Sequence, residues 1–200
     1  MEFKEIVKRR YATKKFDGKQ LTTENVDALF ELIRFSASSY GLQPYRIVSI
    51  TDANVKAQLA PASWNQPQIT TCSHLLVFCA DDRAEERIKG YERMMKQAGM
   101  PEDRIKTYGG MMRGDLTKRS KEAYTEWAKR QCYLALGNAI NGAKSLGFDS
   151  CPMEGFSPDE YKKILKLPAY LHPVCIATFG KAADTQGPKL RYTRNELFIE

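Results

Sequence analysis

Two short basic clusters near opposite ends of the chain are the residues best suited to do chemistry. Neither cluster contains a carboxylate, so neither has a local partner for its positive charges. Guanidinium forks match phosphate oxygens in pairs of hydrogen bonds, and ammonium groups add a point charge. The sequence therefore favours one anion pocket closed by the fold, and two solvated charged runs are the alternative. The cluster residues are Lys8, Arg9, Arg10, Lys14 and Lys15 in the first, and Lys189, Arg191 and Arg194 in the second.

The charge of the rest of the chain is balanced. Eight of the 31 basic residues lie in the two clusters, which leaves 23 against 24 acidic residues. A protein that binds nucleic acid usually spreads its basic residues along a face or helix, often with aromatic residues between them. We therefore expect no nucleic-acid partner, and a basic binding protein without redox activity is the least favoured function.

Cysteine and histidine are too scattered to predict a metal centre. The five cysteines include no C-x-x-C pair, and His74 and His172 each precede a strand-like run. Because ligands of a transition metal must gather at short spacing, we assign structural roles to all seven residues. The motifs G-x-G-x-x-G and G-x-x-x-x-G-K-[ST] are also absent, so the phosphate turns of common nucleotide-binding domains are unsupported.

Length and hydropathy predict one domain without membrane contact. No apolar run approaches the roughly 18 residues of a membrane span. The N-terminus lacks the apolar segment of a signal peptide, so we expect a cytoplasmic protein. The chain contains no internal repeat or linker-like tract, which predicts a single domain over 1–200.

Hydrophobic periodicity predicts helices that alternate with a few strands, in an order that favours an α+β domain. The run at 73–80 is continuously apolar, which is typical of a central strand covered on both faces. The segment 101–118 contains three glycines that would interrupt a helix, and a mobile segment beside a site is one interpretation. The tail at 195–200 is expected to be extended. The other expected elements are helices at 2–10, 53–60, 83–98, 120–147 and 158–166, a helix capped by Thr22 or Thr23, and strands at 45–50 and 173–180.

The helix expected at 120–147 combines two features that rarely occur together. From Cys132 onward it is apolar on nearly all sides, which indicates a buried helix, yet it contains Gly137 and Gly142. Small residues let another backbone approach closely, at a cost of about 1 kcal/mol of helix propensity per glycine. A core helix that spans two subunits explains this composition, and ordinary tight packing is the alternative.

Four segments, taken together and in order, resemble the nitroreductase family of FMN-dependent NAD(P)H oxidoreductases. They are "RRYATKKFD", "SASSYGLQPYRIVSI", "CPMEGFSP" and "GPKLRYT", and they extend over essentially the whole chain. The resemblance implies an α+β nitroreductase-like fold, with a central mixed, mainly antiparallel sheet surrounded by helices. It also implies an intertwined homodimer, with flavin sites at the interface and a C-terminal extension that lies on the partner.

The resemblance assigns part of the chain to each part of FMN. Arg10, Lys189 and Arg191 would hold the phosphate and ribityl end, and Lys14 would give electrostatic support at the pyrimidine edge. No catalytic side chain is implied, because the flavin carries the chemistry. The cofactor-binding residues implied by the resemblance are Arg10, Tyr11, Ala12, Lys14, Ser38, Ser39, Gln43, Pro44, Asn65, Gln68, Pro152, Met153, Glu154, Gly155, Lys189 and Arg191.

Three segments of this set have distinct expected places. The turn 152–155 resembles the one that covers a face of the flavin ring, where a Cβ at Gly155 would obstruct the ring. The loop 38–44 resembles the one that the second subunit contributes, although by itself it is simply rich in turn residues. Asn65 matches a position that hydrogen-bonds the pyrimidine edge.

Three positions depart from the family pattern. Ala12 stands where serine is often found, Gln68 where lysine is frequent, and Gly41 where asparagine is common. Ala12 removes a hydroxyl contact to the phosphate end, and Gln68 can donate a hydrogen bond but brings no charge. We expect these changes to alter redox potential and substrate preference without removing the phosphate clamp.

The function implied by the resemblance is a ping-pong reduction. NADH or NADPH would transfer hydride to FMN, and a nitroaromatic, a quinone or a similar planar acceptor would then be reduced. Dehalogenation, or reduction of a pteridine, an enoate or a flavin on the same fold, is the alternative. The segment 105–116 is a candidate lid over the site, and a loosely packed surface helix is the competing interpretation.

Overall fold

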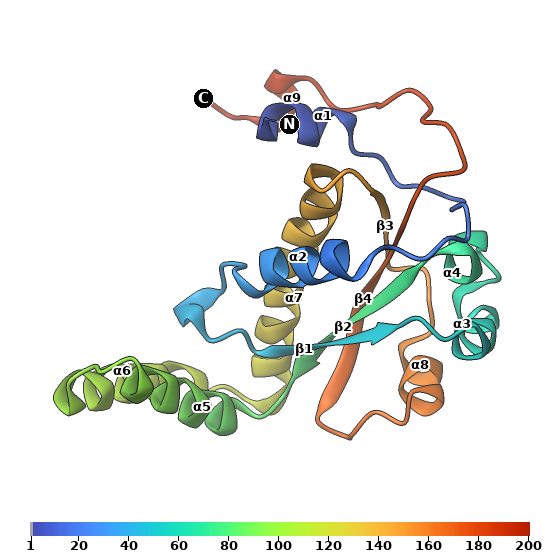
Figure 1. Cartoon of the computed structure of the whole chain (residues 1–200). Coiled ribbons are helices and arrows are strands. Elements are labelled where there is room, and N and C mark those ends of the chain that lie inside the picture. Colours follow the sequence, from blue (N-terminus) through green and yellow to red (C-terminus); the bar gives the residue numbers. More distant parts are fainter. Residues whose placement is uncertain (1) are drawn as a thin grey trace.

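The computed structural model describes residues 2–200 and has an α+β architecture around one four-stranded sheet (Figure 1). The strands lie in the order β1-β2-β4-β3, and each neighbouring pair is antiparallel. A parallel bridge between Ala12 and Ser150 adds the mixed character. The elements are α1 (Phe3–Arg9), α2 (Thr23–Arg34), η1 (Ser39–Gly41), β1 (Tyr45–Ile50), α3 (Ala53–Leu59), η2 (Pro61–Ser63), α4 (Pro67–Thr71), β2 (His74–Asp81), α5 (Ala84–Gln97), α6 (Glu102–Leu116), α7 (Lys121–Ser145), β3 (Asp149–Met153), α8 (Pro158–Ile164), β4 (Leu171–Gly180) and α9 (Arg194–Leu197).

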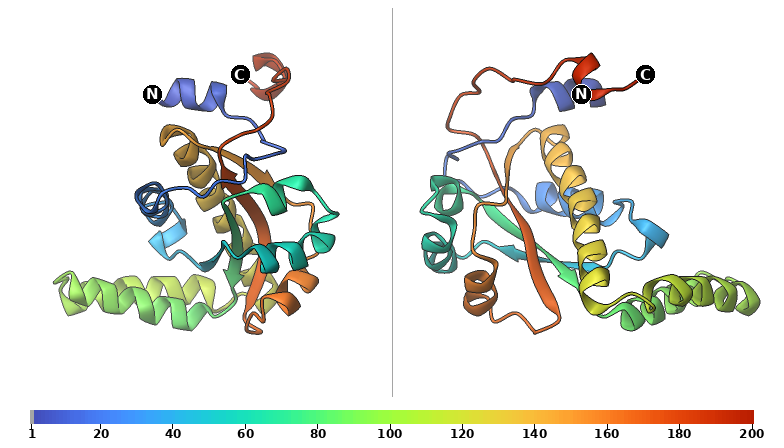
Figure 2. Two further views of the ribbon diagram at one scale, coloured as in Figure 1. Left: turned by 45° about the vertical axis from the view of Figure 1, so that its right-hand side comes forward. Right: turned by 180° about the vertical axis from the view of Figure 1, so that it is seen from behind.

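Helices cover both faces of the sheet, and side chains of β2 alternate between the two resulting cores. Phe78 belongs to the core shared with α2 and α7, whereas Val77 belongs to the core shared with α3, α4 and α8. Figure 2 shows α7 on one side of the sheet and α3 and α8 on the other. The prediction of a central, doubly covered strand is therefore confirmed.

The long helix α7 is buried along one face and open along another. Cys132 and Ala139 are fully buried, but Tyr133 and Leu134 are 41% and 49% exposed. A Cβ at Gly142 would lie 3.0 Å from Leu32 Cδ1 of α2, so this glycine permits close helix packing. The tight-packing alternative accounts for Gly142. It does not account for Gly137, since nothing lies within 4 Å of a Cβ built there.

The segment with three glycines forms a continuous helix, α6, so the prediction that they interrupt it was wrong. Gly109 is needed by a tertiary contact, because Glu92 of α5 crosses directly over it. An added Cβ would lie 2.0 Å from Glu92 Oε1. Because Gly109 has no side chain, Glu92 can reach Arg113 and pair with it at 2.7 Å. Glu85 pairs with the same guanidinium at 2.9 Å. The two helices form a hairpin that projects from the body (Figure 1).

The C-terminal tail also differs from the expected extended chain. Residues Arg194–Leu197 form the short helix α9, which begins with a capping box between Thr193 and Glu196. Leu190, Phe198 and Ile199 around it are exposed. The tail therefore leaves the sheet and presents apolar side chains away from the two cores.

Candidate functional site

The fold joins the two basic clusters through contacts between residues 11–17 and 181–184. Tyr11 Oη donates to Asp184 Oδ1 at 2.9 Å, and the Lys14 backbone N–H donates to Asp184 Oδ2 at 2.7 Å. Backbone bonds from Asp17 N to Lys181 O and from Ala183 N to Lys15 O continue this pairing. The cavity formed beside it has a volume of about 380 Å³. Its lining residues are Arg10, Tyr11, Ala12, Pro152, Gln186, Gly187, Pro188, Lys189, Leu190 and Arg191.

The cavity carries positive charge that no carboxylate offsets. Within residues 2–200, neither Arg10 nor Arg191 pairs with a carboxylate. Burial, and then repulsion from Arg191, lower the pKa of Arg10. Burial, and then repulsion from Arg10 and Arg191, lower the pKa of Lys189. Because the cations disfavour one another, an anion placed between them would be stabilised.

Lys189 has different contacts from those expected of a phosphate ligand. Its Nζ donates to three backbone carbonyls at the end of α1: Val7 O at 2.5 Å, Lys8 O at 3.1 Å and Arg10 O at 2.6 Å. An ammonium has three N–H groups, so all of them are engaged. Lys189 thus ties the tail to the first helix and adds charge to the cavity, while Arg10 and Arg191 supply its guanidinium groups.

A second group of predicted residues converges on the end of β3. Lys14 Nζ lies 3.7 Å from Cys151 Sγ, and Gln68 Nε2 lies 3.9 Å from the same sulfur. Gln68 Nε2 also donates to Gln66 Oε1 at 3.1 Å and contacts Met153 Sδ at 3.5 Å. Burial raises the pKa of the Cys151 thiol, and the charge of Lys14 opposes this shift. The thiol therefore lies beside the ammonium in its neutral form at neutral pH.

The turn after β3 packs against an aromatic side chain that sequence reasoning did not single out. A Cβ at Gly155 would lie 2.5 Å from Trp64 Cζ3. Gln66 Nε2 donates to Gly155 O at 3.0 Å, so the same loop fixes the turn twice. Asn65 lies between Trp64 and Gln66 in the chain. Both Trp64 and Asn65 have a positive backbone φ, of +56° and +54° respectively. Trp64 is 71% exposed, so its indole forms part of the surface beside the turn.

Glu154 is held by a residue of α7. Tyr133 Oη donates to Glu154 Oε1 at 2.7 Å, and burial is the first cause that raises the pKa of this tyrosine. The carboxylate of Glu154 is therefore engaged as a hydrogen-bond acceptor. Nothing in the sequence near Tyr133 distinguishes it from the other aromatic residues of the helix, so its place beside the turn could not be predicted.

The loop 38–44 does not join the other predicted residues within one chain. It lies at the start of β1, whereas α3 and α4 lie at the other end of that strand (Figure 1). Ser39 N donates to Gln131 Oε1 at 2.8 Å, and Ser38 Oγ accepts from Gln43 N at 2.9 Å. Pro44 O accepts from Asp81 N at 3.0 Å. The assignment of this loop to the site of a second subunit stays a prediction.

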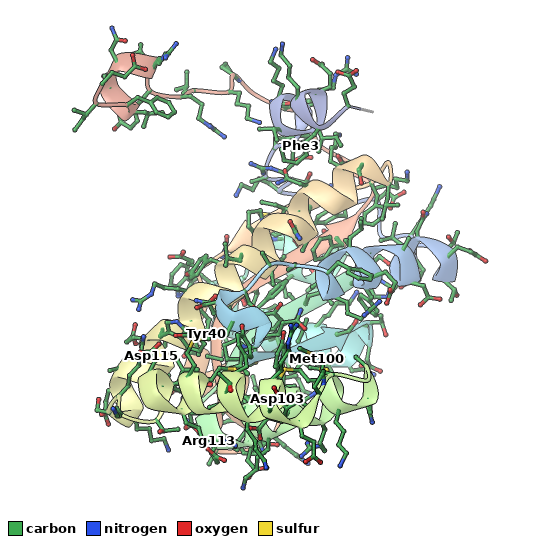
Figure 3. All side chains as sticks on the ribbon, turned by 90° about the vertical axis from the view of Figure 1, so that its left-hand side faces the viewer. Phe3, Tyr40, Met100, Asp103, Arg113 and Asp115 are labelled. Atoms are coloured by element: carbon green, nitrogen blue, oxygen red, sulfur yellow. The ribbon has the colours of Figure 1, made fainter. Side chains whose placement is uncertain are left out.

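The candidate lid, residues 105–116, makes up most of α6 in the α5–α6 hairpin. Tyr40 Oη donates to Asp115 Oδ2 at 2.9 Å, and Tyr108 Oη donates to Tyr40 O at 3.2 Å. Figure 3 shows Tyr40 close to Asp115, with Met100 and Asp103 farther along the hairpin. These contacts make α6 a packed helix tied to the 38–44 loop.

Residues 2–200 contain neither a candidate membrane span nor a candidate metal site. No helix there is long and apolar enough to cross a membrane. No group of three or more histidine, cysteine, aspartate or glutamate side chains in that range could hold a metal ion, and each of the five cysteines is buried and free.

Comparisons with known proteins agree with this fold. The model of the nitroreductase family matches residues 7–181. A candidate NAD(P)H nitroreductase of Staphylococcus haemolyticus is 33% identical over 204 residues, which cover 94% of this chain and 92% of that protein. Among solved structures, the candidate nitroreductase YdfN of Bacillus subtilis has a TM-score of 0.91 at 25% identity, covering 99% of this chain and 97% of that one.

A further solved structure holds a cofactor. A candidate nitroreductase of Exiguobacterium sibiricum, crystallised in complex with FMN, has a TM-score of 0.92 at 24% identity. The match covers 100% of this chain and 97% of that chain. With the family model matching most of its length and its sheet and helices arranged as in these structures, this chain belongs to the nitroreductase family.

Proposed function

We propose that this protein is an FMN-dependent oxidoreductase that uses NADH or NADPH to reduce nitroaromatics, quinones or similar planar acceptors in a ping-pong cycle. The observation that carries the proposal is the cavity where both ends of the chain place arginines without carboxylate partners. Family membership and the names of the relatives agree with this chemistry.

The residues of the site fit the parts of FMN. Arg10 and Arg191 line a cavity of about 380 Å³ and are suited to the phosphate, because guanidinium forks match its oxygens. Lys14 and Gln68, which meet at Cys151, are suited to the pyrimidine edge. Pro152 lines the first cavity, so the 152–155 turn begins beside it. When bound, FMN supplies the hydride chemistry.

The chain itself supplies binding and electrostatics. The Lys14 ammonium lies 3.7 Å from Cys151 of β3, where it would stabilise negative charge on a bound ring. Glu154 is held by Tyr133, and Gly155 O accepts from Gln66, so the turn is ordered from two sides. This arrangement positions a planar group without requiring a side chain to act as acid or base.

The proposed active form is a homodimer whose sites lie at the interface. Tyr133 and Leu134 leave an apolar strip exposed on α7, and Leu190, Phe198 and Ile199 are exposed in the tail. In the homodimer that the resemblance implies, the second copy would also bring its 38–44 loop to the site. Light scattering tests the dimer, and a monomer at all protein concentrations would contradict it.

Absorbance of the purified protein is the direct test of the function. Visible flavin bands that bleach when NADH or NADPH is added under argon, and return when a quinone or nitroaromatic is added, are the expected result. A colourless protein that does not take up added FMN would contradict the proposal. Comparing a nitroaromatic, a halophenol and an enoate as acceptors separates nitro reduction from other chemistry on this fold.

A further inference from the structure

The arginines without carboxylate partners are not scattered over the molecule. Of the 13 arginines in the sequence, six pair with a carboxylate within residues 2–200. Two of the others, Arg10 and Arg191, line the candidate phosphate cavity. Three more, Arg46, Arg87 and Arg93, line one separate cavity of about 370 Å³. Five of the seven arginines without an ion pair in residues 2–200 therefore line these two cavities, and Arg104 and Arg130 lie elsewhere.

The second cavity lies between the start of β1 and the first turns of α5. Glu86 is the carboxylate in its lining, and it already lies 3.6 Å from Lys89. Arg83 also lines the cavity, but its guanidinium is already engaged: Nη2 pairs with the buried Asp81 at 2.7 Å, and Cζ lies 3.3 Å from the centre of the Tyr170 ring. The positive charge of the remaining three arginines is left without an anionic partner.

Arg87 is fixed in this cavity, whereas its two neighbours are exposed. Its Nη2 donates to Leu42 O at 3.3 Å and to Gln43 O. Burial, and then repulsion from Arg46, lower the pKa of Arg87. Within residues 2–200, Arg10 and Arg87 are the arginines whose pKa is lowered, with burial as the first cause in each and a nearby arginine as the second. Each of these guanidinium groups thus lies near a second arginine, and at Arg87 the charge of Asp81 partly opposes the shift.

We propose that the cavity lined by Arg46, Arg87 and Arg93 binds a phosphoryl group, as an anion site separate from the one lined by Arg10 and Arg191. Exposed Arg46 and Arg93 can turn toward a ligand, and fixed Arg87 provides a preorganised donor. The phosphoryl group comes either from free phosphate or from a nucleotide such as NADPH, whose 2′-phosphate NADH lacks.

Occupancy of this cavity would act on the 38–44 loop. Arg87 holds the carbonyls of Leu42 and Gln43, in a loop where Tyr40 and Gln43 both have a positive φ. Such backbone costs about 1–3 kcal/mol per residue unless its surroundings fix it. An anion that anchors the Arg87 guanidinium would therefore also order this loop.

Calorimetric titration with inorganic phosphate at constant ionic strength tests the site. The Arg10→Gln/Arg191→Gln protein lacks both guanidinium groups of the competing cavity, and in this background we expect saturable phosphate binding. Adding Arg46→Gln or Arg93→Gln should weaken binding about tenfold each, as expected for loss of one charged hydrogen bond. Lys163→Gln, which removes a charge from an exposed side chain on α8, is the matched control and should leave binding unchanged.

The same phosphate titrations can also contradict the proposal. Phosphate binding that disappears in Arg10→Gln/Arg191→Gln, or that is unaffected by the Arg46→Gln/Arg93→Gln pair, would show that this cavity binds no phosphate. Both substituted residues are exposed and lack ion pairs, so equal melting temperatures are expected and loss of folding would not mimic loss of binding.

Steady-state kinetics identifies the source of the phosphoryl group, and this arm alone rests on the proposed function. A KM for NADPH that rises about tenfold in Arg46→Gln/Arg93→Gln, with the KM for NADH unchanged, assigns the cavity to the donor nucleotide. Equal KM values combined with lost phosphate binding assign it to free phosphate. Lack of reductase activity with intact phosphate binding would reject the proposed function and leave this site standing.

Discussion

Three glycines in one helix allow a sharp test of why α6 contains them. Replacing Gly109 with alanine places a Cβ 2.0 Å from Glu92 Oε1 and 3.1 Å from Arg113 Nη1, whereas nothing lies within 4 Å of a Cβ at Gly110. Alanine favours a helix over glycine by about 1 kcal/mol. Gly110→Ala should therefore stabilise the protein by about that amount. Gly109→Ala should not, because its added methyl group displaces an ion pair.

The expected difference between the two variants follows from the displaced contact. Glu92 can move because it is the end of a flexible side chain, so the cost is mainly loss of its bond to Arg113 at 2.7 Å. The two side chains are 23% and 35% exposed, and an ion pair of this kind contributes about 1 kcal/mol. We expect Gly109→Ala to be less stable than Gly110→Ala by about 1–2 kcal/mol. In a chain of this length, each kcal/mol changes Tm by about 2–4 °C.

Thermal melts of both variants, alone and combined with Glu92→Ala, measure this difference. In the Glu92→Ala background the obstruction is absent, so Gly109→Ala should stabilise as much as Gly110→Ala. The hydrogen bond from Arg113 is the first cause that lowers the pKa of Glu92. A carboxyl with a lowered pKa stabilises the fold above its unfolded pKa and loses this contribution as pH falls through its folded pKa, so the gap between the variants should narrow below about pH 4. Equal stabilisation by both alanines in the parent protein would refute the reasoning.

Other substitutions test the site and the dimer. Arg10→Gln should weaken FMN binding at least about tenfold in a fluorescence titration, while Arg9→Gln, whose side chain is exposed, should have little effect; equal losses would argue against the cavity. Gly155→Ala should change indole fluorescence, because its Cβ would lie 2.5 Å from Trp64 Cζ3 and the indole, which is 71% exposed, would have to move. Deleting residues 195–200 removes exposed apolar side chains and should weaken the proposed dimer in light scattering, whereas an unchanged dimer would exclude the tail as an arm.

Elements whose signal is local could be predicted from the sequence. The strand at 45–50 matches β1 at both ends, because its β-branched residues suit a pleated strand. The apolar run at 73–80 predicted both ends of β2 to within one residue. The helix α6 could not be predicted, because the local rule reads Gly109 as a breaker, while the reason for that glycine is a carboxylate 17 positions earlier in the chain.

The site was predictable to the extent that it depends on charge. Two clusters without acids indicated one cavity, and the fold joins them. The role of Lys189 could not be found this way, because the three carbonyls it contacts become acceptors only where α1 ends beside the tail. The contact between Trp64 and Gly155 could not be predicted either, because it depends on a loop in which two successive residues have a positive φ.

The contacts of Gln68 bear on what this position supplies in the proposed site, where the resemblance makes lysine the frequent residue. Its amide is buried and donates to Gln66 Oε1, with Met153 Sδ 3.5 Å away, so it orders the loop and the end of β3. It brings no charge, so in the proposed site Lys14 is the cation at the pyrimidine edge, and Cys151 is its neutral neighbour. A ring bound there would experience one positive charge fewer than beside two lysines. Since positive charge stabilises a reduced, anionic flavin, the physical consequence is a lower reduction potential, which makes the reduced cofactor a stronger reductant and extends its range to acceptors that are harder to reduce.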